Sequence, residues 1–368
     1  MGKNVVHITS VHPRYDTRIF HKECLSLVKF GYDVSLIVAD GIGCEVLSGV
    51  SISDVGTERG RIKRFFLVGL RVYRQAINSS ADIYHIHDPE LIFVGLLLRL
   101  CGKKVVFDSH EDVPKQILDK PYFNKPTAFL VSSAYRVIER LAIPLFSGVV
   151  AATSTIRNKF AIMNSKVIDV NNFPTKRGRG VSGSVSTDGK IFVCYVGAIS
   201  ETRGILEIVD AMDLCRSNVY LLLGGKFGVA NLKDKVSRRK GWSKVDYLGY
   251  LSRDEVDAVL SRSVAGLVTL YPTASYVEAL PVKMFEYMNA GIPVISSDFK
   301  ILTEIVKNVG CGLCVNPKDP IEIAKAIDCL VENSVEAKEM GLRGKGAIDE
   351  VYNWDNEENK LIEFYDSL

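Results

Sequence analysis

The fold of this 368-residue chain is decided by one stretch in its C-terminal third, VEALPVKMFEYMNAGIPVI, residues 277–295. Pro281 favours the first turn of a helix, because proline lacks the backbone N–H that is unpaired there anyway. Gly291 and Pro293 predict the end of that helix, and Val294-Ile295 predicts a buried strand directly after it. The stretch therefore predicts a helix followed by a strand, which is the repeating unit of an α/β protein.

The predicted helix start has the chemistry of an anion-binding site. A helix N-terminus exposes unpaired backbone N–H groups and a positive dipole end, and Lys283 adds a full charge beside them. About one and a half turns further on, Glu286 can accept hydrogen bonds from a ribose diol, and Glu278 can reach hydroxyls beyond the phosphates. The stretch predicts a clamp for a nucleotide-sugar, and the alternative is a solvated amphipathic helix with ordinary surface glutamates.

Residues 280–295 closely resemble the donor-site signature of the family 4 glycosyltransferases, which are retaining enzymes of the GT-B fold. In that family, two glutamates spaced as Glu278 and Glu286 contact the donor sugar and the ribose. The resemblance implies that Leu280, Val282 and Lys283 bind the nucleotide-sugar together with Glu286. It extends over essentially the whole chain and is most specific between residues 278 and 295.

The composition indicates a soluble globular protein with two domains. The chain is longer than one ordinary core requires, and 47% of its residues are hydrophobic and 24% charged. The longest apolar run, residues 91–101, is interrupted by Arg99 and is too short to span a bilayer. The N-terminus resembles a core strand rather than a targeting segment, so we expect a cytoplasmic protein.

The positive charge is concentrated in the first half of the chain. Residues 1–175 contain 22 Lys and Arg against 16 Asp and Glu. This excess allows attraction to an anionic surface. It argues against a nucleic-acid partner, for which a concentrated basic face with stacking aromatic residues would be expected.

The first half starts as a parallel βαβ unit, with a strand at 4–9, a loop at 10–18, a helix at 19–30 and a strand at 33–38. Ligands of such units bind at the carboxyl ends of the strands, so the loop is expected at the edge of a site. The loop lacks a glycine-rich phosphate fingerprint, which argues against a dinucleotide-binding dehydrogenase. The resemblance places the loop on the acceptor side of an interdomain cleft, although the family's paired glycines are missing.

Polar residues follow two further predicted strands, in residues 82–90 and 104–112. His87, Asp88 and His110 fall there, and they could form a hydroxyl-binding surface or a metal centre. His85 shares a strand face with Ile83 and is expected in the core. The family resemblance implies that a histidine at the position of His110 faces the donor sugar and the reacting centre.

No metal or other cofactor is expected. The histidines and carboxylates of the first half do not have the helical spacing of a known ligand motif. Cys311 and Cys314 have the spacing of a zinc pair, but no second pair and no later histidine accompany them. The eight cysteines are expected to be reduced, and several fall in apolar strands or helices.

The segment from Arg61 to Arg74 predicts a basic amphipathic helix. Such a helix could lie on an anionic membrane, and the alternative is a helix that packs by its apolar stripe and leaves its arginines in solvent. Relatives that act on lipid-linked acceptors favour the membrane. The two sides are formed by Arg64, Arg71 and Arg74, and by Phe66, Leu70, Tyr73 and Ile77.

The second half opens with a strand at 191–196 and the turn GAISETRG, residues 197–204, before a helix. This turn resembles the family's phosphate loop, with Gly197 as its first glycine and Arg203 at its second basic position, where a guanidinium suits a diphosphate. Ala198 leaves the first basic position empty, so Arg203 and Lys283 would carry the countercharge, or Lys226 would join them. The turn from Leu248 to Leu251 is implied to offer backbone groups to the nucleotide base.

We therefore expect an α/β protein of the GT-B fold, with two Rossmann-like parallel-sheet domains facing across a cleft. The predicted parts are an acceptor-side domain at 1–174, a linker at 175–189, a nucleotide-sugar domain at 190–350 and a C-terminal helix at 351–368 that packs back on the first domain.

The expected function is retaining transfer of a sugar from a nucleotide-sugar, with UDP ahead of GDP, to a glycan or lipid-linked acceptor in cell-surface polysaccharide assembly. Arg203 and Lys283 would stabilise the leaving diphosphate, and His110 and Glu278 would position the sugar. The alternatives are a GT-B nucleotide-sugar epimerase and a non-catalytic assembly partner of the same fold.

Overall fold

The computed structural model describes residues 3–60, 63–120, 123–176 and 190–368. The chain divides into two compact units, which are considered separately below. Unit 1 comprises Met1–Asn172 and Trp354–Leu368, and unit 2 comprises Phe173–Asn353. Most of the predicted linker at 175–189 lies outside the described residues.

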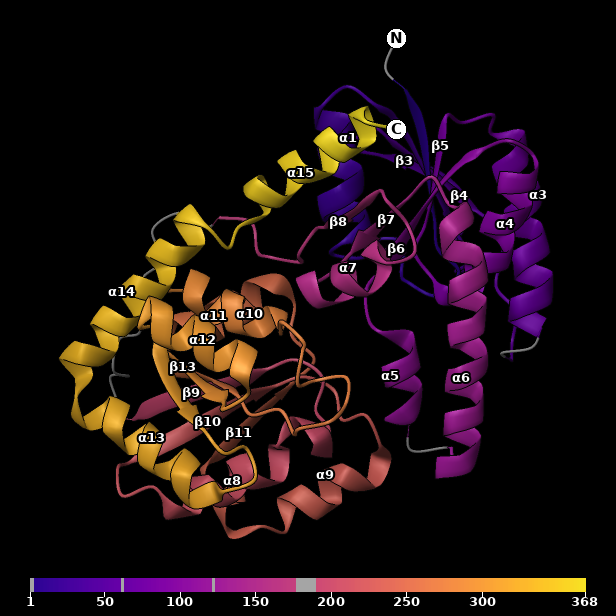
Figure 1. The fold of residues 1–368 in the computed structure, drawn as a ribbon. Coiled ribbons are helices and arrows are strands. Elements are labelled where there is room, and N and C mark those ends of the chain that lie inside the picture. The colour runs from indigo at the N-terminus through magenta and orange to yellow at the C-terminus, as the bar shows by residue number, and fades with distance from the viewer. Residues whose placement is uncertain (1–2, 61–62, 121–122, 177–189) are drawn as a thin grey trace. The chain divides into compact units, whose positions relative to one another are not determined.

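Unit 1 is built on an eight-stranded sheet in the order β3-β4-β2-β1-β5-β6-β7-β8 (Figure 1). Its strand pairs are parallel except for the antiparallel pair of β3 and β4. The order reverses at β1, which lies between β2 and β5, and such a switch point is where open α/β sheets bind ligands. The strands are β1 (Asn4–Ile8), β2 (Asp33–Val38), β3 (Glu45–Leu47), β4 (Val50–Asp54), β5 (Ile83–Ile86), β6 (Lys104–Ser109), β7 (Gly148–Ala151) and β8 (Val167–Asp169).

The two faces of this sheet bury alternate residues against different helices, as the two-residue period of a strand requires. In β1, Val6 and Ile8 pack on the side of α3, α4 and α7, whereas Val5 packs on the side of η1, α1 and α15. The helices are η1 (Ile19–Cys24), α1 (Leu25–Lys29), η2 (Arg64–Val68), α3 (Gly69–Asn78), η3 (Pro89–Leu91), α4 (Ile92–Leu100), α5 (Val113–Leu118), α6 (Lys125–Ala142), η4 (Ile143–Leu145), α7 (Ser154–Ala161) and α15 (Trp354–Asp366).

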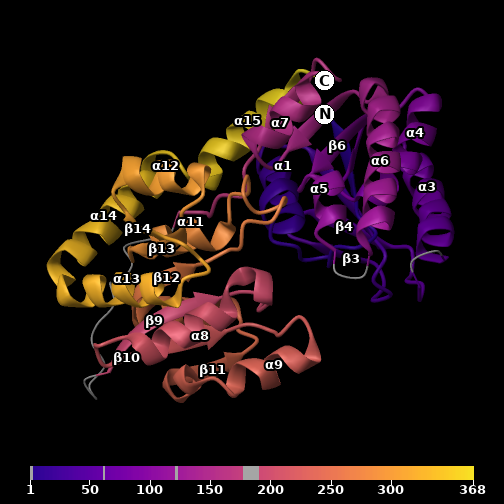
Figure 2. The ribbon, with the colours of Figure 1, turned by 60° about the horizontal axis from the view of Figure 1, so that its bottom comes forward.

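Unit 2 contains a six-stranded, fully parallel sheet in the order β11-β10-β9-β12-β13-β14 (Figure 2). Its order reverses at β9, so the turn after β9 is the expected ligand site of this sheet. The strands are β9 (Ile191–Val196), β10 (Val219–Gly224), β11 (Val245–Gly249), β12 (Ser263–Val268), β13 (Val294–Ser297) and β14 (Gly312–Val315).

Helices cover both faces of this sheet as well. Val193 and Tyr195 of β9 pack against α8 and α13, whereas Phe192 and Cys194 pack on the side of α10, α11 and α12. The helices are η5 (Glu201–Arg203), α8 (Ile205–Leu214), α9 (Ala230–Ser237), η6 (Lys240–Lys244), α10 (Arg253–Ser261), α11 (Val282–Asn289), α12 (Lys300–Val309), α13 (Pro320–Glu332) and α14 (Ser334–Glu350).

The stretch at 277–295 folds into the predicted helix and strand, with a small shift at its start. Pro281 is the N-cap of α11 rather than its first helical residue, and its backbone is extended. Gly291 has a φ of +75° and follows Ala290, the C-cap of the helix, at a position where a residue with a side chain would be strained. Strand β13 then begins at Val294, as the sequence predicts.

The hairpin of β3 and β4 is absent from the sequence prediction. Ser48 and Gly49 link the two strands and have φ values of +50° and +82°. Two consecutive residues with positive φ are typical of the type I′ turn, whose twist matches that of a hairpin. The alternation of Val46, Val50 and Ile52 with polar residues around a Ser-Gly pair was the signal that could have revealed it.

Candidate active site

The turn after β9 brings the backbone close to two basic side chains. Gly197 has a φ of +130°, which favours glycine, and its N–H donates to the carbonyl of Gly224 at 2.9 Å. A Cβ at this position would lie 3.6 Å from Lys283 Nζ and 4.0 Å from Arg203 Nη1. The loop at the carboxyl end of the central strand therefore faces both cations that the sequence predicted for phosphate binding.

Lys283 carries a buried ammonium group without a hydrogen-bond partner in the described part of the chain. Its Nζ lies 3.5 Å from the centroid of the Tyr195 ring. Burial, and to a lesser extent the nearby charge of Arg203, lower the pKa of Lys283 well below its usual value. A buried ammonium that lacks an acceptor is costly, so the position is suited to a ligand that brings negative charge.

Arg203 lies beside Lys283 and forms no salt bridge with a carboxylate among the described residues. Its Nε donates to the Tyr276 hydroxyl at 3.3 Å, and its Nη1 donates to the carbonyl of Ala198 at 3.4 Å. Gly204 follows with a φ of +71°, and a Cβ there would lie 2.3 Å from the carbonyl oxygen of Thr269. The left-handed backbone conformation of Gly204 thus lets the chain turn between Arg203 and the start of α8.

The start of α11 is held against the end of β9 by the tyrosine one turn after Lys283. The backbone N–H of Val196 donates to the Tyr287 hydroxyl at 3.1 Å. Gly266 of β12 leaves room for the Tyr287 ring, because a Cβ there would lie 2.2 Å from the ring. No side chain caps the helix start. Its first N–H groups, together with Lys283, thus lie at the carboxyl edge of the sheet.

The two glutamates of the predicted clamp have different surroundings. Glu286 lies on α11 and accepts a hydrogen bond from Arg253 Nη1 at 2.6 Å through Oε1. Sequence reasoning did not anticipate this ion pair, because Arg253 is 33 residues away on α10. Glu278 is exposed in the irregular segment before α11. The helix therefore positions Glu286 firmly, whereas Glu278 lies outside regular secondary structure.

The remaining residues predicted for nucleotide binding lie near the same sheet edge. Leu248 and Leu251 are partly buried around the end of β11, and Leu251 fills the space that Gly224 leaves without a side chain. Leu280 is partly buried before α11 and Val282 is its first residue. Lys226 stacks its ammonium 4.7 Å from the ring centroid of Tyr250.

In unit 1, Asp88 fixes the loop that follows β1. Its Oδ2 accepts hydrogen bonds from the Thr9 hydroxyl at 2.9 Å and from the backbone N–H of Ser10 at 2.5 Å. His12 Nε2 lies 3.4 Å from Asp88 Oδ1. The ends of β1 and β5 are thus connected at the switch point. The role of Asp88 visible here is to hold this loop.

His110 lies at the end of β6 beside two groups that the sequence alone could not place. His110 Nε2 is 3.3 Å from Asp108 Oδ2 and 3.3 Å from His87 Nδ1, and His87 Nδ1 is 3.4 Å from Asp108 Oδ2. Arg18 donates to both oxygens of Asp108 at 3.1 Å. Burial alone would raise the pKa of Asp108, but the Arg18 charge holds it well below its usual value.

Further polar groups lie behind this cluster in the core of unit 1. His7 and His85 are register partners on β1 and β5, and His7 Nδ1 is 2.8 Å from His87 Nε2. The Tyr365 hydroxyl of α15 lies 2.6 Å from His85 Nδ1. Burial raises the pKa of Glu23 well above its usual value, and the charge of Asp108 adds to this increase. His85 is thus buried, as expected, but it contacts polar groups as well as core residues.

Two sets of these side chains also have spacings that would suit a metal ion. They are His7, Glu23, His85 and His87, and His87, Asp108 and His110. The carboxylates of both sets are already engaged by Arg18, which lies 2.9 Å from Glu23. A cation bound to either set would lie next to the positive charge of the Arg18 guanidinium, which opposes its binding. The expectation that no metal is needed stays a prediction.

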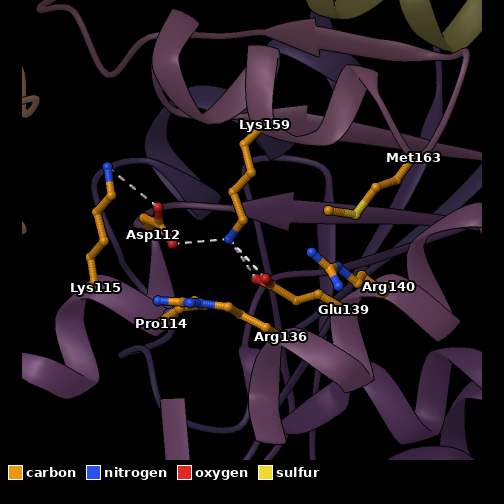
Figure 3. Close-up of a pocket in the computed structure, with 8 residues that line it drawn as sticks. All are labelled: Asp112, Pro114, Lys115, Arg136, Glu139, Arg140, Lys159 and Met163. Carbon is orange, nitrogen blue, oxygen red and sulfur yellow. Dashed lines mark hydrogen bonds and ion pairs between the residues drawn. The ribbon is translucent and has the colours of Figure 1, made fainter. Parts of the chain in front are cut away.

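Unit 1 contains a pocket of about 250 Å³ (Figure 3). One of its lining residues is Asp112, two positions after His110 in the sequence. Lys159 Nζ lies between Asp112 and Glu139, at 2.9 Å and 2.8 Å from their oxygens. Arg136 and Arg140 line the same pocket from α6, and neither forms a salt bridge with a described residue. The pocket therefore has an excess of positive charge.

The predicted basic helix does not pack as the second expectation describes, and the first expectation, contact with a membrane, stays a prediction. Val68, Val72 and Ala76 are buried, whereas Phe66 and Leu70 of the predicted apolar stripe are exposed. Arg64 pairs with Glu90 at 3.0 Å and Arg71 pairs with Glu58. The prediction that this stripe packs the helix while the arginines stay in solvent is therefore wrong for Phe66, Leu70 and both arginines. Arg61 lies outside the described residues.

Comparisons with known proteins find a family match in the second half of the chain and relatives along most of its length. Residues 182–346 match the family described as "Glycosyl transferases group 1". The chain is 25% identical over 301 residues to an uncharacterised glycosyltransferase of Methanocaldococcus jannaschii, MJ1607, with 77% of this chain and 75% of that protein covered. It is 24% identical to MMP α-(1→4)-mannosyltransferase of Mycolicibacterium hassiacum, with 81% and 74% covered.

The fold has known counterparts over its full length. The Anabaena protein Alr3699/HepE, whose structure was solved in complex with UDP and glucose, superposes with a TM-score of 0.75 at 13% identity and with 100% of both chains covered. Together with the two parallel sheets, these comparisons establish that the chain is a glycosyltransferase of the GT-B fold. More narrowly, residues 182–346 of the second half match the model of the glycosyl transferases group 1.

Among the described residues, no helix is both long enough and apolar enough to cross a membrane.

Proposed function

We propose that this glycosyltransferase moves a sugar from a nucleotide-sugar to a hydroxyl of a glycan or lipid-linked acceptor, with retention of the anomeric configuration. UDP is the proposed nucleotide ahead of GDP, and assembly of cell-surface polysaccharide is the proposed role. The observation that carries the donor assignment is the buried Lys283 ammonium, which lies beside Arg203 and has no anionic partner in the described chain.

The chemistry of a departing diphosphate fits these groups. As the bond between the sugar and the phosphate breaks, negative charge accumulates on the leaving oxygen. Lys283, Arg203 and the uncapped N–H groups at the start of α11 are fixed before the reaction and stabilise that charge. Removing one such donor typically costs a factor of about 100 to 1,000 in rate. The acceptor proton passes to the leaving phosphate, so no side chain is assigned as the base.

The other predicted residues hold the donor. Glu286 offers its carboxylate to the ribose diol, and Arg253 keeps that carboxylate oriented. His110 and Glu278 position the sugar. The positive pocket that starts at Asp112 is a place where an acceptor bearing a phosphate could bind. No metal takes part in this mechanism, because Lys283 and Arg203 supply the countercharge.

A nucleotide-binding experiment tests the donor site. Wild-type protein is titrated by calorimetry with UDP, GDP, ADP and their common sugar conjugates, including UDP-glucose and GDP-mannose. One nucleotide should bind at least tenfold more tightly than the others, and Arg203→Gln should weaken it. If no nucleotide binds to folded wild-type protein, the donor-site assignment is wrong. The anomeric proton signals of the first product in an NMR spectrum then test retention.

Association with a membrane surface is proposed for exposed apolar residues on η2, α3 and α4. Phe66 and Leu100 are 66% and 84% exposed, and Leu70, Phe93 and Leu97 add further exposed apolar surface. Basic residues that could meet anionic lipid include Lys63 and Arg74. In sedimentation with phosphatidylglycerol-containing vesicles, Phe66→Glu should reduce binding, whereas Ile162→Glu should not, although Ile162 is even more exposed than Phe66. Equal binding of both variants would contradict the proposal.

A further inference from the structure

The cluster behind His110 determines which of its two ring nitrogens carries the proton. In a neutral imidazole one nitrogen is an N–H donor and the other is an acceptor. His110 Nε2 lies 3.3 Å from Asp108 Oδ2, and this oxygen belongs to a carboxylate that is completely buried. An unprotonated Nε2 would direct its lone pair at that negative charge, so the proton is expected on Nε2.

Asp108 is held in the ionised form that this argument needs. Both of its oxygens accept from Arg18 at 3.1 Å. Arg18 also donates from Nη1 to the carbonyl of Val170 at 2.7 Å and lies 2.9 Å from Glu23. An ionised carboxylate can only accept hydrogen bonds. The Arg18 guanidinium therefore holds the Asp108 carboxylate in place beside the imidazole ring of His110.

The neighbouring histidines are compatible with this arrangement. His87 Nδ1 also faces Asp108, at 3.4 Å, and His87 Nε2 faces His7 Nδ1 at 2.8 Å. If His87 donates from Nδ1 to Asp108, it accepts from His7. A His87 that instead donates to His7 would direct the lone pair of its Nδ1 at Asp108, so the argument made for His110 disfavours it. The Nε2–H form of His110 is satisfied, because Asp108 accepts from it.

This form leaves Nδ1 of His110 as a hydrogen-bond acceptor. No described residue forms a hydrogen bond with that nitrogen, and the His110 side chain is 20% exposed. An acceptor nitrogen can accept a hydrogen bond from a sugar hydroxyl. It cannot bind an ionised carboxylate in this way, because a carboxylate has no proton to donate. We propose that Asp108 is a positioning residue that fixes His110 in the Nε2–H form, so that Nδ1 accepts a hydroxyl of the donor sugar. The second half of this proposal depends on the proposed function.

The tautomer can be measured on the free protein, without any substrate. Long-range ¹H–¹⁵N correlation spectra of protein with ¹⁵N-labelled histidine distinguish the two nitrogens of each ring, and the chain has only six histidines. His110→Gln identifies the His110 signals. Wild-type protein should show His110 with the proton on Nε2. A wild-type spectrum with the proton on Nδ1 would overturn the proposal.

Two isosteric variants separate a specific role of Asp108 from the general effect of replacing a buried carboxyl group beside Arg18. Asp108→Asn removes the anionic acceptor, so His110 should shift to the Nδ1–H form or to a mixture. Glu23→Gln is the matched control, because Glu23 is equally buried and also pairs with Arg18, but no contact joins it to His110. An equal tautomer shift in both variants would contradict a specific role of Asp108.

Donor turnover gives the functional readout. Release of UDP from UDP-glucose should lose roughly tenfold in kcat in Asp108→Asn, as expected for one hydrogen bond, while the affinity for UDP stays within about twofold. An unchanged kcat, or a loss confined to UDP affinity, would overturn the positioning role. A failure of wild-type protein to bind any nucleotide would contradict the proposed function but leave the tautomer result valid. Stoichiometric metal whose removal by EDTA shifts the His110 signals would overturn the proposal, because a metal would occupy Nε2.

Discussion

Replacing Lys283 by methionine should stabilise the free protein and at the same time abolish binding of the diphosphate. Methionine keeps the unbranched stem of lysine but removes the ammonium, whose Nζ is buried without a hydrogen-bond partner in the described chain. A buried cationic site that binds an anion lowers the stability of the free protein while no anion is bound. A lysine with only a structural role would show the opposite effect, because its loss would cost stability.

The expected magnitude follows from two opposing contributions. An unsatisfied buried polar group costs about 1–3 kcal/mol, and more when it is charged. The contact with Tyr195, at 3.5 Å from the ring centroid, offsets about 0.5–2 kcal/mol of that cost. Because the group is charged, its cost is taken at the upper end, about 3 kcal/mol. A net gain of about 1–2.5 kcal/mol then remains for Lys283→Met, which corresponds to a rise of roughly 2–10 °C in Tm for a unit of this size.

The gain should depend on pH in a defined direction. Because the pKa of Lys283 is lowered in the folded state, the unfolded chain binds more protons between the folded pKa and the ordinary lysine value. The stability of the wild-type protein therefore rises with pH in that window, by at most about 1.4 kcal/mol per pH unit. The advantage of Lys283→Met should accordingly shrink as the pH rises from 7 to 10.

Fluorescence can follow the unit that contains the substitution. The chain has two tryptophans, Trp242 in unit 2 and Trp354 in unit 1. In a Trp354→Phe background, urea unfolding monitored through Trp242 reports on unit 2. Lys300→Met is the control, because Lys300 is exposed at the start of α12 and its loss should change stability by less than about 0.5 kcal/mol. A destabilised Lys283→Met, or one that still binds UDP with unchanged affinity, would refute the reasoning.

Three further predictions concern the same site. Glu286→Gln should weaken UDP binding by about 10- to 100-fold in calorimetry while leaving pyrophosphate binding unchanged, whereas a parallel loss of both would place Glu286 near the phosphates. Gly197→Ala should weaken UDP binding, because Gly197 has a φ of +130° and its Cβ would approach Lys283, whereas Gly346→Ala, with open space around it, should bind normally. Binding of UDP at pH 8 should take up protons, since the diphosphate raises the lowered pKa of Lys283, and the measured enthalpy should differ between Tris and phosphate buffers; equal enthalpies would contradict this.

The regular elements around the donor site could be predicted because their signals are local. The helix and strand of residues 277–295 follow from a proline, a glycine and an apolar run, and the turn at Gly197 follows from its position between a strand and a helix. Arg203 and Lys283 lie together because each is at the carboxyl edge of the sheet. A parallel sheet with known strand ends therefore determines most of this arrangement.

The contacts that could not be predicted join residues distant in sequence. Asp108 and Arg18 are 90 residues apart in the sequence. They meet because Asp108 is near the end of β6 and Arg18 is in the loop that follows β1 in the same sheet. The pairing of Glu286 with Arg253 likewise depends on how α10 and α11 pack. Strand order and helix packing determine these pairs, and neither can be read from the spacing of the residues themselves.

Unit 1 is made of two segments that are far apart in the sequence, and this has a consequence for synthesis on the ribosome. Trp354, Leu361 and Tyr365 of α15 are buried among residues from the first strands, and the Tyr365 hydroxyl contacts His85. The first 172 residues therefore leave the exit tunnel without the helix that covers one face of their sheet, whereas Phe173–Asn353 is continuous and complete before the last residues emerge. During translation, the nascent chain should thus expose an apolar sheet face until α15 has left the tunnel, and that interval is when a chaperone would be needed.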